Sequence, residues 1–328
     1  MPDAELDLAT RAAWLSYVGG YTQEEISARL GVSRIKVTRL IAQATQAGLV
    51  HVFVDGPAVA CIALEEEIKA RWRLGFCTVA LNVDEAPLPL TALAAAGAHF
   101  LHRQLEGGTG VIGVGHGRTL AAVVNAMPRV PRPGLRFVSL IGSLTRRSAA
   151  NPFDVIHRLT EITAAEGYFM PAPFFADSIE DKQVLMAQKS IRAVMALAHE
   201  AELHVVGIGA AAPTSHLVTA GMINEAEHER VLAAGAVGEI LGCFIGPDGR
   251  PVDTEVNERG MAVPLSDLAG RRVIAVAGGR GKAAAIAAVL ESRVITGLIT
   301  DEATARELVA MDCRPENRPQ QQAPDKAA

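Results

Sequence analysis

Two glycine-rich segments carry the residue types that bind anions. Residues 113–119 read GVGHGRT, and residues 277–282 read AGGRGK and precede an alanine-rich helical stretch. Glycines let backbone N–H groups approach an anion, and the N-terminus of a following helix attracts negative charge. Neither segment has the spacing of a dinucleotide fingerprint or of a GxxxxGK[ST] loop. Both are candidate anion sites, although a tight turn without a ligand explains either one equally well.

Glu239 is a carboxylate within the apolar stretch GEILGCF at residues 238–244. A buried carboxylate costs free energy unless it has a partner. A ligand hydroxyl is one possible partner, and Arg250 or Arg259 is the alternative.

Other polar side chains follow apolar runs at Ser143, Asn257 and Asp301. Gly142 and Ser143 have the composition of a satisfied turn, and Asp301 has the position of a helix cap, so each has a structural alternative to ligand binding.

Two kinds of ligand fit these residues. Arg118 and Lys282 would surround an anionic group such as a phosphate. Glu239, Asn257 and Asp301 would instead accept and donate hydrogen bonds to the hydroxyl groups of a neutral ligand. The sequence leaves both open.

Short apolar runs precede these loops and predict the strands of a parallel sheet. Helical stretches, such as residues 90–105 and 119–127, lie between them, which favours a sheet covered on both faces. In such doubly wound, Rossmann-like domains, ligands bind beyond the carboxyl ends of the strands. The predicted strands are residues 77–81, 110–114, 136–142, 202–209, 271–279 and 294–300.

A helix-turn-helix is predicted between residues 20 and 49. Thr22 and Glu25 have the spacing of a capping box, Gly31 permits a left-handed turn, and Ser33 is placed to cap the second helix. A helix at residues 8–18 would complete the module, and the alternating residues 49–54 predict a short strand, as in a winged helix.

The module is a basic island on an acidic protein. Arg29, Arg34, Lys36 and Arg39 lie in or next to a stretch from Ile26 to residue 54 that contains no Asp or Glu, whereas the whole chain has a net charge of −5. Such a charge distribution favours binding to DNA phosphates. An amphipathic helix pair in a bundle is the alternative.

In the second helix Val37, Leu40, Ile41 and Ala44 have helical spacing and face inward. The predicted DNA-binding residues are Thr22, Ser33, Arg34, Lys36, Val37 and Arg39.

Composition excludes several classes. The 328 residues are 49% hydrophobic, without an apolar run long enough to span a membrane, and the acidic N-terminus is unlike a signal peptide. Four scattered cysteines lack metal-ligand spacing and indicate a reducing cytoplasm. We expect neither a metal nor a cofactor.

The predicted domains are residues 1–56 for DNA, 57–313 for the ligand, and a disordered tail at 314–328. Residues 58–73 predict a helix that links domains or subunits, or that packs on its own domain.

Over residues 8–309 the chain resembles the SorC family of sugar-binding bacterial transcriptional regulators. The motifs that carry the resemblance are YTQEEISARLGVSRIKVTRLI, GVGHGRTL, IGS, VVGIG, GAVGEILGCFIGPDGRP with NERG, VIAVAGGRGKAAAI and LITDEATA. The polyol- and erythritol-responsive branch is the most similar in its N-terminal module.

This resemblance implies an operator-binding helix-turn-helix and an effector domain similar to the sugar-phosphate isomerase and deaminase fold, often in homotetramers. His116 stands where the family frequently has an aromatic residue. The implied effector-binding residues are Gly115, His116, Gly117, Arg118, Thr119, Gly142, Ser143, Glu239, Asn257, Arg259, Gly278, Gly279, Lys282 and Asp301.

The predicted function is therefore a DNA-binding regulator of a carbohydrate or polyol operon, controlled by a sugar, polyol or sugar phosphate. The rival hypothesis is a sugar-phosphate isomerase or deaminase, with Glu239, Asp301 or His116 as the base. No segment pairs Asp with His or Lys as those enzymes require, so we predict no catalysis. A third hypothesis, in which Lys282 or Lys189 captures an aldehyde as a Schiff base, also remains open.

Overall fold

The computed structural model describes residues 3–50, 59–81, 87–107, 110–143, 155–212 and 215–311. Its first three helices are α1 (Asp3–Tyr17), α2 (Gln23–Leu30) and α3 (Arg34–Gln46), which form the predicted helix-turn-helix with its preceding helix. They have a hydrophobic core of their own, centred on Ile26, Val37 and Leu40.

Most of the remaining chain is built on one parallel sheet of seven strands, in the order β1-β10-β9-β5-β2-β3-β4. The strands are β1 (Phe76–Ala80), β2 (Gly110–Val114), β3 (Leu135–Ser139), β4 (Glu166–Tyr168), β5 (Leu203–Val206), β9 (Val273–Val276) and β10 (Gly297–Asp301). All six predicted strands overlap observed strands within a few residues, and the strand predicted at 110–114 coincides with β2. β3 and β4 lie on one side of β2, whereas β5, β9 and β10 lie on its other side, so the strand order reverses between β2 and β5 and their carboxyl ends form the switch point.

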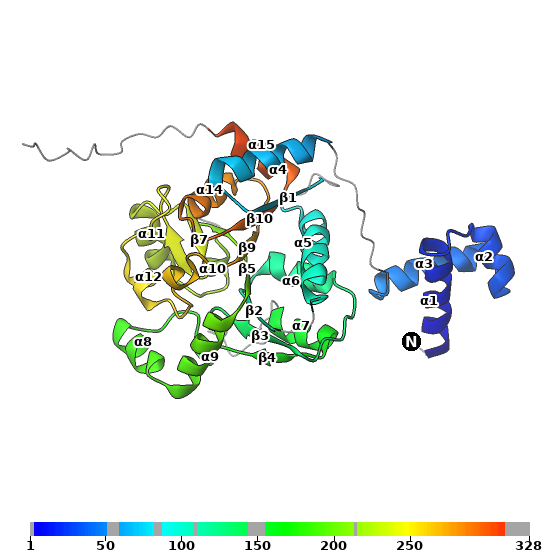
Figure 1. The fold of residues 1–328 in the computed structure, drawn as a ribbon, viewed down its shortest axis with the longest axis horizontal. Helices are drawn as coiled ribbons and strands as arrows, with labels where there is room; N and C mark the ends of the chain where they lie inside the picture. The colour runs from blue at the N-terminus through cyan, green and yellow to red at the C-terminus, as the bar shows by residue number, and fades with distance from the viewer. Residues whose placement is uncertain are drawn as a thin grey trace, which may run out of the picture.

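Helices cover both faces of this sheet (Figure 1). Adjacent strand residues such as Leu298 and Ile299 pack into different hydrophobic clusters, one on each face. This explains why the strands are continuously apolar. One face packs against α5 (Leu90–Leu105), α6 (Arg118–Asn125) and α7 (Val155–Thr163). The other packs against α4 (Val59–Trp72), α9 (Lys189–Glu200), α14 (Ala283–Glu291) and α15 (Glu302–Ala310).

A smaller antiparallel sheet follows β5. Its strands are β6 (Gly209–Ala210), β7 (Gly238–Ile240) and β8 (Cys243–Ile245), with β7 in the centre. α14 packs against β6 and β7 of this sheet. The remaining helices of this part of the chain are α8 (Ile179–Met186), α10 (His216–Thr219), α11 (Glu225–Ala233), α12 (Glu255–Arg259) and α13 (Leu265–Leu268).

Some sequence predictions fall where the structure gives no description. The predicted domain boundary near residue 56 and the C-terminal tail lie outside the described residues, as does most of the strand predicted at 49–54. Leu49 and Val50, which are described, lie in no strand.

Candidate functional site

A cavity of about 530 Å³ lies at the carboxyl ends of β2, β5 and β9. The loops that follow these three strands form its walls, together with Glu239 from β7. The cavity lies at the switch point of the sheet, which is where doubly wound domains bind ligands.

The first wall is the loop between β2 and α6. Gly117 has a φ of 128°, a conformation that favours glycine, and is the N-cap of α6. Arg118 is the first residue of that helix and is exposed, whereas the side chain of Thr119 is buried. The first backbone N–H groups of α6 therefore accompany a guanidinium at the cavity.

The second wall is the loop between β9 and α14. Gly279 has a φ of 106°, and a Cβ there would lie 2.8 Å from the carbonyl oxygen of Pro87. The Gly279 N–H donates to Asp301 Oδ2 and to Thr304 Oγ1, both at 2.9 Å. Asp301 therefore holds the backbone of this loop by accepting a hydrogen bond from the Gly279 N–H.

The third wall combines the end of β5 with β7. Lys282 Nζ donates to the carbonyl oxygen of Ile208 at 3.0 Å, which joins the second and third walls. A Cβ on Gly209 would lie 2.5 Å from Glu239 Oε2, so a side chain there would collide with this carboxyl group. Glu239 Oε1 accepts a hydrogen bond from the Gly242 N–H.

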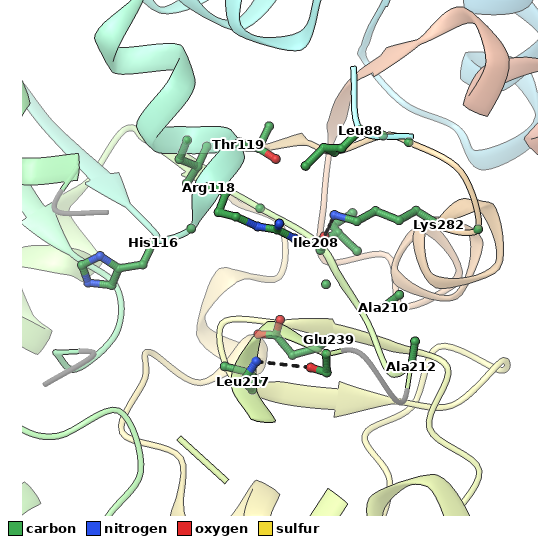
Figure 2. Close-up of a pocket in the computed structure, with 18 of the residues that line it drawn as sticks. Leu88, His116, Arg118, Thr119, Ile208, Ala210, Ala212, Leu217, Glu239 and Lys282 are labelled. Atoms are coloured by element: carbon green, nitrogen blue, oxygen red, sulfur yellow. Dashed lines mark hydrogen bonds between the residues drawn. The ribbon is translucent and has the colours of Figure 1, made fainter. Parts of the chain in front are cut away.

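Charge is unevenly distributed around this cavity. Burial raises the pKa of Glu239 to about 7, against the opposing effects of the Gly242 hydrogen bond and of Lys282. Burial and the nearby Arg118 lower the pKa of Lys282. Figure 2 shows Arg118 and Lys282 extending toward each other from opposite walls, with Glu239 on a third side. Two converging cations destabilise each other unless an anion lies between them.

The N-terminal helices have the caps and the turn of a helix-turn-helix. The Thr22 side chain and Glu25 form the capping box of α2, and Gly31 ends that helix with a φ of 64°. Ser33 caps α3 by accepting a hydrogen bond from the Lys36 N–H at 3.3 Å. The Thr38 hydroxyl lies 3.1 Å from Gln23 Oε1, which ties α3 to α2.

Comparison with known proteins places this architecture in a family. Residues 57–310 match the Sugar-bind family model, a sugar-binding domain. The chain is 47% identical over 310 residues to the erythritol catabolism regulatory protein EryD of Brucella abortus, covering 94% of this chain and 98% of that protein. It is 34% identical over 314 residues to the transcriptional regulator LsrR of Klebsiella pneumoniae, covering 94% of each. The chain belongs to the SorC family of sugar-binding regulators.

The fold agrees with this assignment. The full-length sorbitol operon regulator SorC from Klebsiella pneumoniae superposes with a TM-score of 0.68, over 93% of this chain and 99% of that one. At 24% identity this likeness shows the fold alone. Like its relatives, this SorC-family chain is a transcriptional regulator, not an enzyme.

Among the described residues no group of three His, Cys, Asp or Glu side chains could hold a metal ion. In the same part of the chain, no helix is both long and apolar enough to cross a membrane.

Several residues predicted to bind effector have structural roles instead. Gly142 packs against the backbone of Pro173, where a Cβ would lie 2.0 Å from the carbonyl oxygen. The Ser143 N–H donates to the Ala172 carbonyl at 2.8 Å, and the Gly115 N–H donates to Val205 at 2.9 Å. These three residues shape strand ends and are not among the residues that line the cavity.

The polar residues of the late loops are corrected in the same way. Asn257 exchanges hydrogen bonds with the backbone of Phe244 at 2.7 and 2.9 Å and holds β8. Arg259 is 4% exposed and pairs with Glu227, not with Glu239. Asp301 is 1% exposed and caps α15 by accepting from the Thr304 N–H. The Asn257 and Asp301 side chains are therefore engaged by the protein, and the two terminal nitrogens of Arg259 are held by the Ala176 carbonyl and by Glu227.

Two further predicted contacts disagree with the directions in which the side chains point. His116 belongs to the cavity wall, but its ring lies 3.3 Å from the Ser139 hydroxyl and points away from Arg118, Lys282 and Glu239 (Figure 2). Val37, predicted to contact DNA, is fully buried in the helical module and positions α3 instead.

The cavity retains Gly117, Arg118, Thr119, Glu239 and, from the second loop, the predicted residues Gly278, Gly279 and Lys282. The lining residues that the sequence did not assign to the site include Leu88, Phe174, Ile208, Arg280, Ser215 and Leu217. The VVGIG motif at 205–209 had drawn attention to Ile208. Arg280 belongs to the glycine-rich segment 277–282, which was also singled out, whereas Leu88, Phe174, Ser215 and Leu217 carried no such signal because they reach the cavity through tertiary packing.

Proposed function

We propose that this protein binds operator DNA through α2 and α3 and is controlled by a phosphorylated sugar or polyol in the cavity at the switch point. The observation that carries the choice of effector is the convergence of Arg118 and Lys282 between two glycine loops. Guanidinium, ammonium and helix N–H groups together are the donors that a phosphate ester requires.

The balance of charge favours an anionic ligand. Arg118, Arg280 and Lys282 line the cavity, against the single carboxyl group of Glu239. With a pKa of about 7, Glu239 is only partly ionised at neutral pH and is able to donate to a ligand hydroxyl. A phosphate would bind between the cations, and the carbohydrate hydroxyls would extend toward Glu239.

A neutral polyol is the second candidate, and it receives less support. Of the three residues that the sequence offered for it, Asn257 and Asp301 are engaged in structural hydrogen bonds, which leaves Glu239. A relative at 47% identity is named for erythritol catabolism, so we include polyol phosphates in the proposed class.

Control of transcription requires that effector binding alters DNA binding. A ligand does this when it binds two arrangements of the subunits with different affinities. We propose a cytoplasmic homo-oligomer, a dimer or tetramer, with domains at 1–56 and 57–313. Its paired α3 helices would enter major grooves about 34 Å apart or a multiple of that spacing.

The test of the effector class is a thermal-shift comparison of matched compounds. Four-, five- and six-carbon polyols, their monophosphate esters and inorganic phosphate are each added to the full-length protein. At least one ester raises the Tm more than its parent polyol and more than phosphate does, because ligands of the native state stabilise it.

The matched variants are Arg118→Gln in the cavity and Arg192→Gln at an exposed position on α9. Arg118→Gln reduces the shift by the ester, and Arg192→Gln retains it. Equal shifts by an ester and its parent polyol would favour the neutral-polyol alternative, and no shift by any compound would contradict the effector site.

A further inference from the structure

The outer surface of α3 carries an apolar side chain that the module's core does not use. Ile35 is 84% exposed, the highest value among the large hydrophobic side chains of the described residues. It is the second residue of α3, directly after Arg34. Single exposed apolar residues are common, so its surroundings must decide whether it has a role.

Helical geometry directs Ile35 away from the protein. Val37, Leu40 and Ala44 form the buried stripe of α3. Ile35 precedes Val37 by two residues, about 200° around the helix, so it points in nearly the opposite direction. Arg39, four residues after Ile35, lies on the same outward face.

The neighbours of Ile35 are positively charged and exposed. Arg34 and Lys36 flank it in sequence, and Arg39 follows one turn later. Arg34 has one weak partner, Glu24 at 4.0 Å, in an ion pair exposed on both sides. An apolar side chain ringed by cations complements a polyanion that presents an apolar group, not an apolar protein surface.

Double-stranded DNA presents such a group in its major groove. The C5 methyl of thymine is the apolar feature that base edges offer there, and apolar side chains contact it. The N-terminal residues of a recognition helix are those that reach the base edges. We propose that Ile35 contacts the methyl group of a thymine in the operator and makes that position specific for thymine. This inference rests on the proposed binding of operator DNA by α3.

The experiment removes the methyl group from the DNA and the side chain from the protein. Full-length protein first selects duplexes from a randomised pool. Each thymine of the selected sequence is then replaced by uracil, which lacks only the methyl group. Affinities are measured for the wild type, for Ile35→Ala and for Ile35→Val.

Replacing a single thymine of the operator by uracil weakens wild-type binding by about fourfold at the position that Ile35 contacts, the loss expected for one buried methyl group. Ile35→Ala weakens binding to the thymine duplex and removes the difference between thymine and uracil, whereas Ile35→Val retains part of it. Ile35→Ala leaves the helix intact because alanine has the higher helix propensity and the site is exposed.

Arg39→Ala is the comparison variant because it removes a charge from the same face. It weakens binding and reduces the slope of log K against log salt concentration by the amount expected for about one phosphate contact for each bound α3. Ile35→Ala leaves this slope unchanged. A selected sequence without thymine, or a uracil penalty that persists in Ile35→Ala, would overturn the role of Ile35 alone. If no sequence were selected, operator binding itself would fail.

Discussion

Glu239 and Lys282 face the same cavity, and burial shifts both side chains toward their neutral forms. The pKa of Glu239 rises to about 7 and that of Lys282 falls. Burial disfavours the charged form of each side chain, and their mutual attraction offsets only part of that cost, so a ligand that forms hydrogen bonds with both stabilises them. The two residues are therefore the part of the protein where pH and ligand binding should interact.

Glu239→Gln should change how the empty effector domain depends on pH. The unfolded chain loses the Glu239 proton near its ordinary pKa of 4.5, while the folded chain keeps it to about 7. Native stability from this group is thus complete below pH 4.5 and falls as the pH rises to about 7, by up to about 3 kcal/mol. We predict that Glu239→Gln melts at a higher temperature than the wild type above pH 7, and at a similar temperature below pH 4.5. A difference in Tm that does not vary with pH would contradict this account.

Asp301 illustrates a residue whose role depends on the direction of its side chain. Asp301→Ala removes an acceptor from the Gly279 and Thr304 N–H groups, and we predict a loss of about 1–3 kcal/mol together with weaker effector binding. Chemical denaturation and the ligand-induced Tm shift measure the two effects. Asp253→Ala, at an exposed position, is the control. Unchanged stability with lost ligand binding would mean that Asp301 contacts the ligand directly.

At the scale of elements, the sequence predicted what local chemistry determines. Thr22, Ser33 and Gly31 act within one helical turn, so their caps and the turn could be predicted and are confirmed. Six of the strands of the large sheet could be predicted because each lies in a continuous apolar run of the sequence. The edge strand β4 has the sequence EGY and no apolar run, so it was missed.

Elements that depend on distant partners could not be predicted. The two-residue strand β6 exists only because it pairs with β7, nearly thirty residues later in the chain. Arg259 finds Glu227 across 32 residues, and the sequence offered no reason to prefer it to Glu239. These contacts decide which polar side chains remain for a ligand, which is why the predicted site contained structural residues.

Gly31→Ala tests the turn between α2 and α3. A Cβ there meets nothing within 4 Å, so the cost is the left-handed backbone alone, about 1–2 kcal/mol. We predict faster hydrogen exchange in α2 and α3, with the effector domain unchanged. Gly270→Ala is the matched control, since its φ of 76° and open surroundings place the same strain in the effector domain. Equal effects of both variants on α2 and α3 would contradict a local turn.

At the scale of the whole molecule, a cation-lined cavity and a helix-turn-helix belong to one chain of a regulator family. Allosteric coupling between two sites is typically about 1–3 kcal/mol, or about 5- to 150-fold in affinity. The proposal places the origin of this coupling at the anion held by Arg118, far in the sequence from α3.

The most direct test measures DNA affinity with and without effector in two proteins. A labelled duplex selected by the full-length protein is titrated with the wild type and with Arg118→Gln, each with and without the phosphate ester that raises the Tm most. We predict that both proteins bind DNA equally without the ester, and that the ester changes the affinity of the wild type alone. An equal response of both proteins, or no response of the wild type to an ester that binds it, would contradict the account.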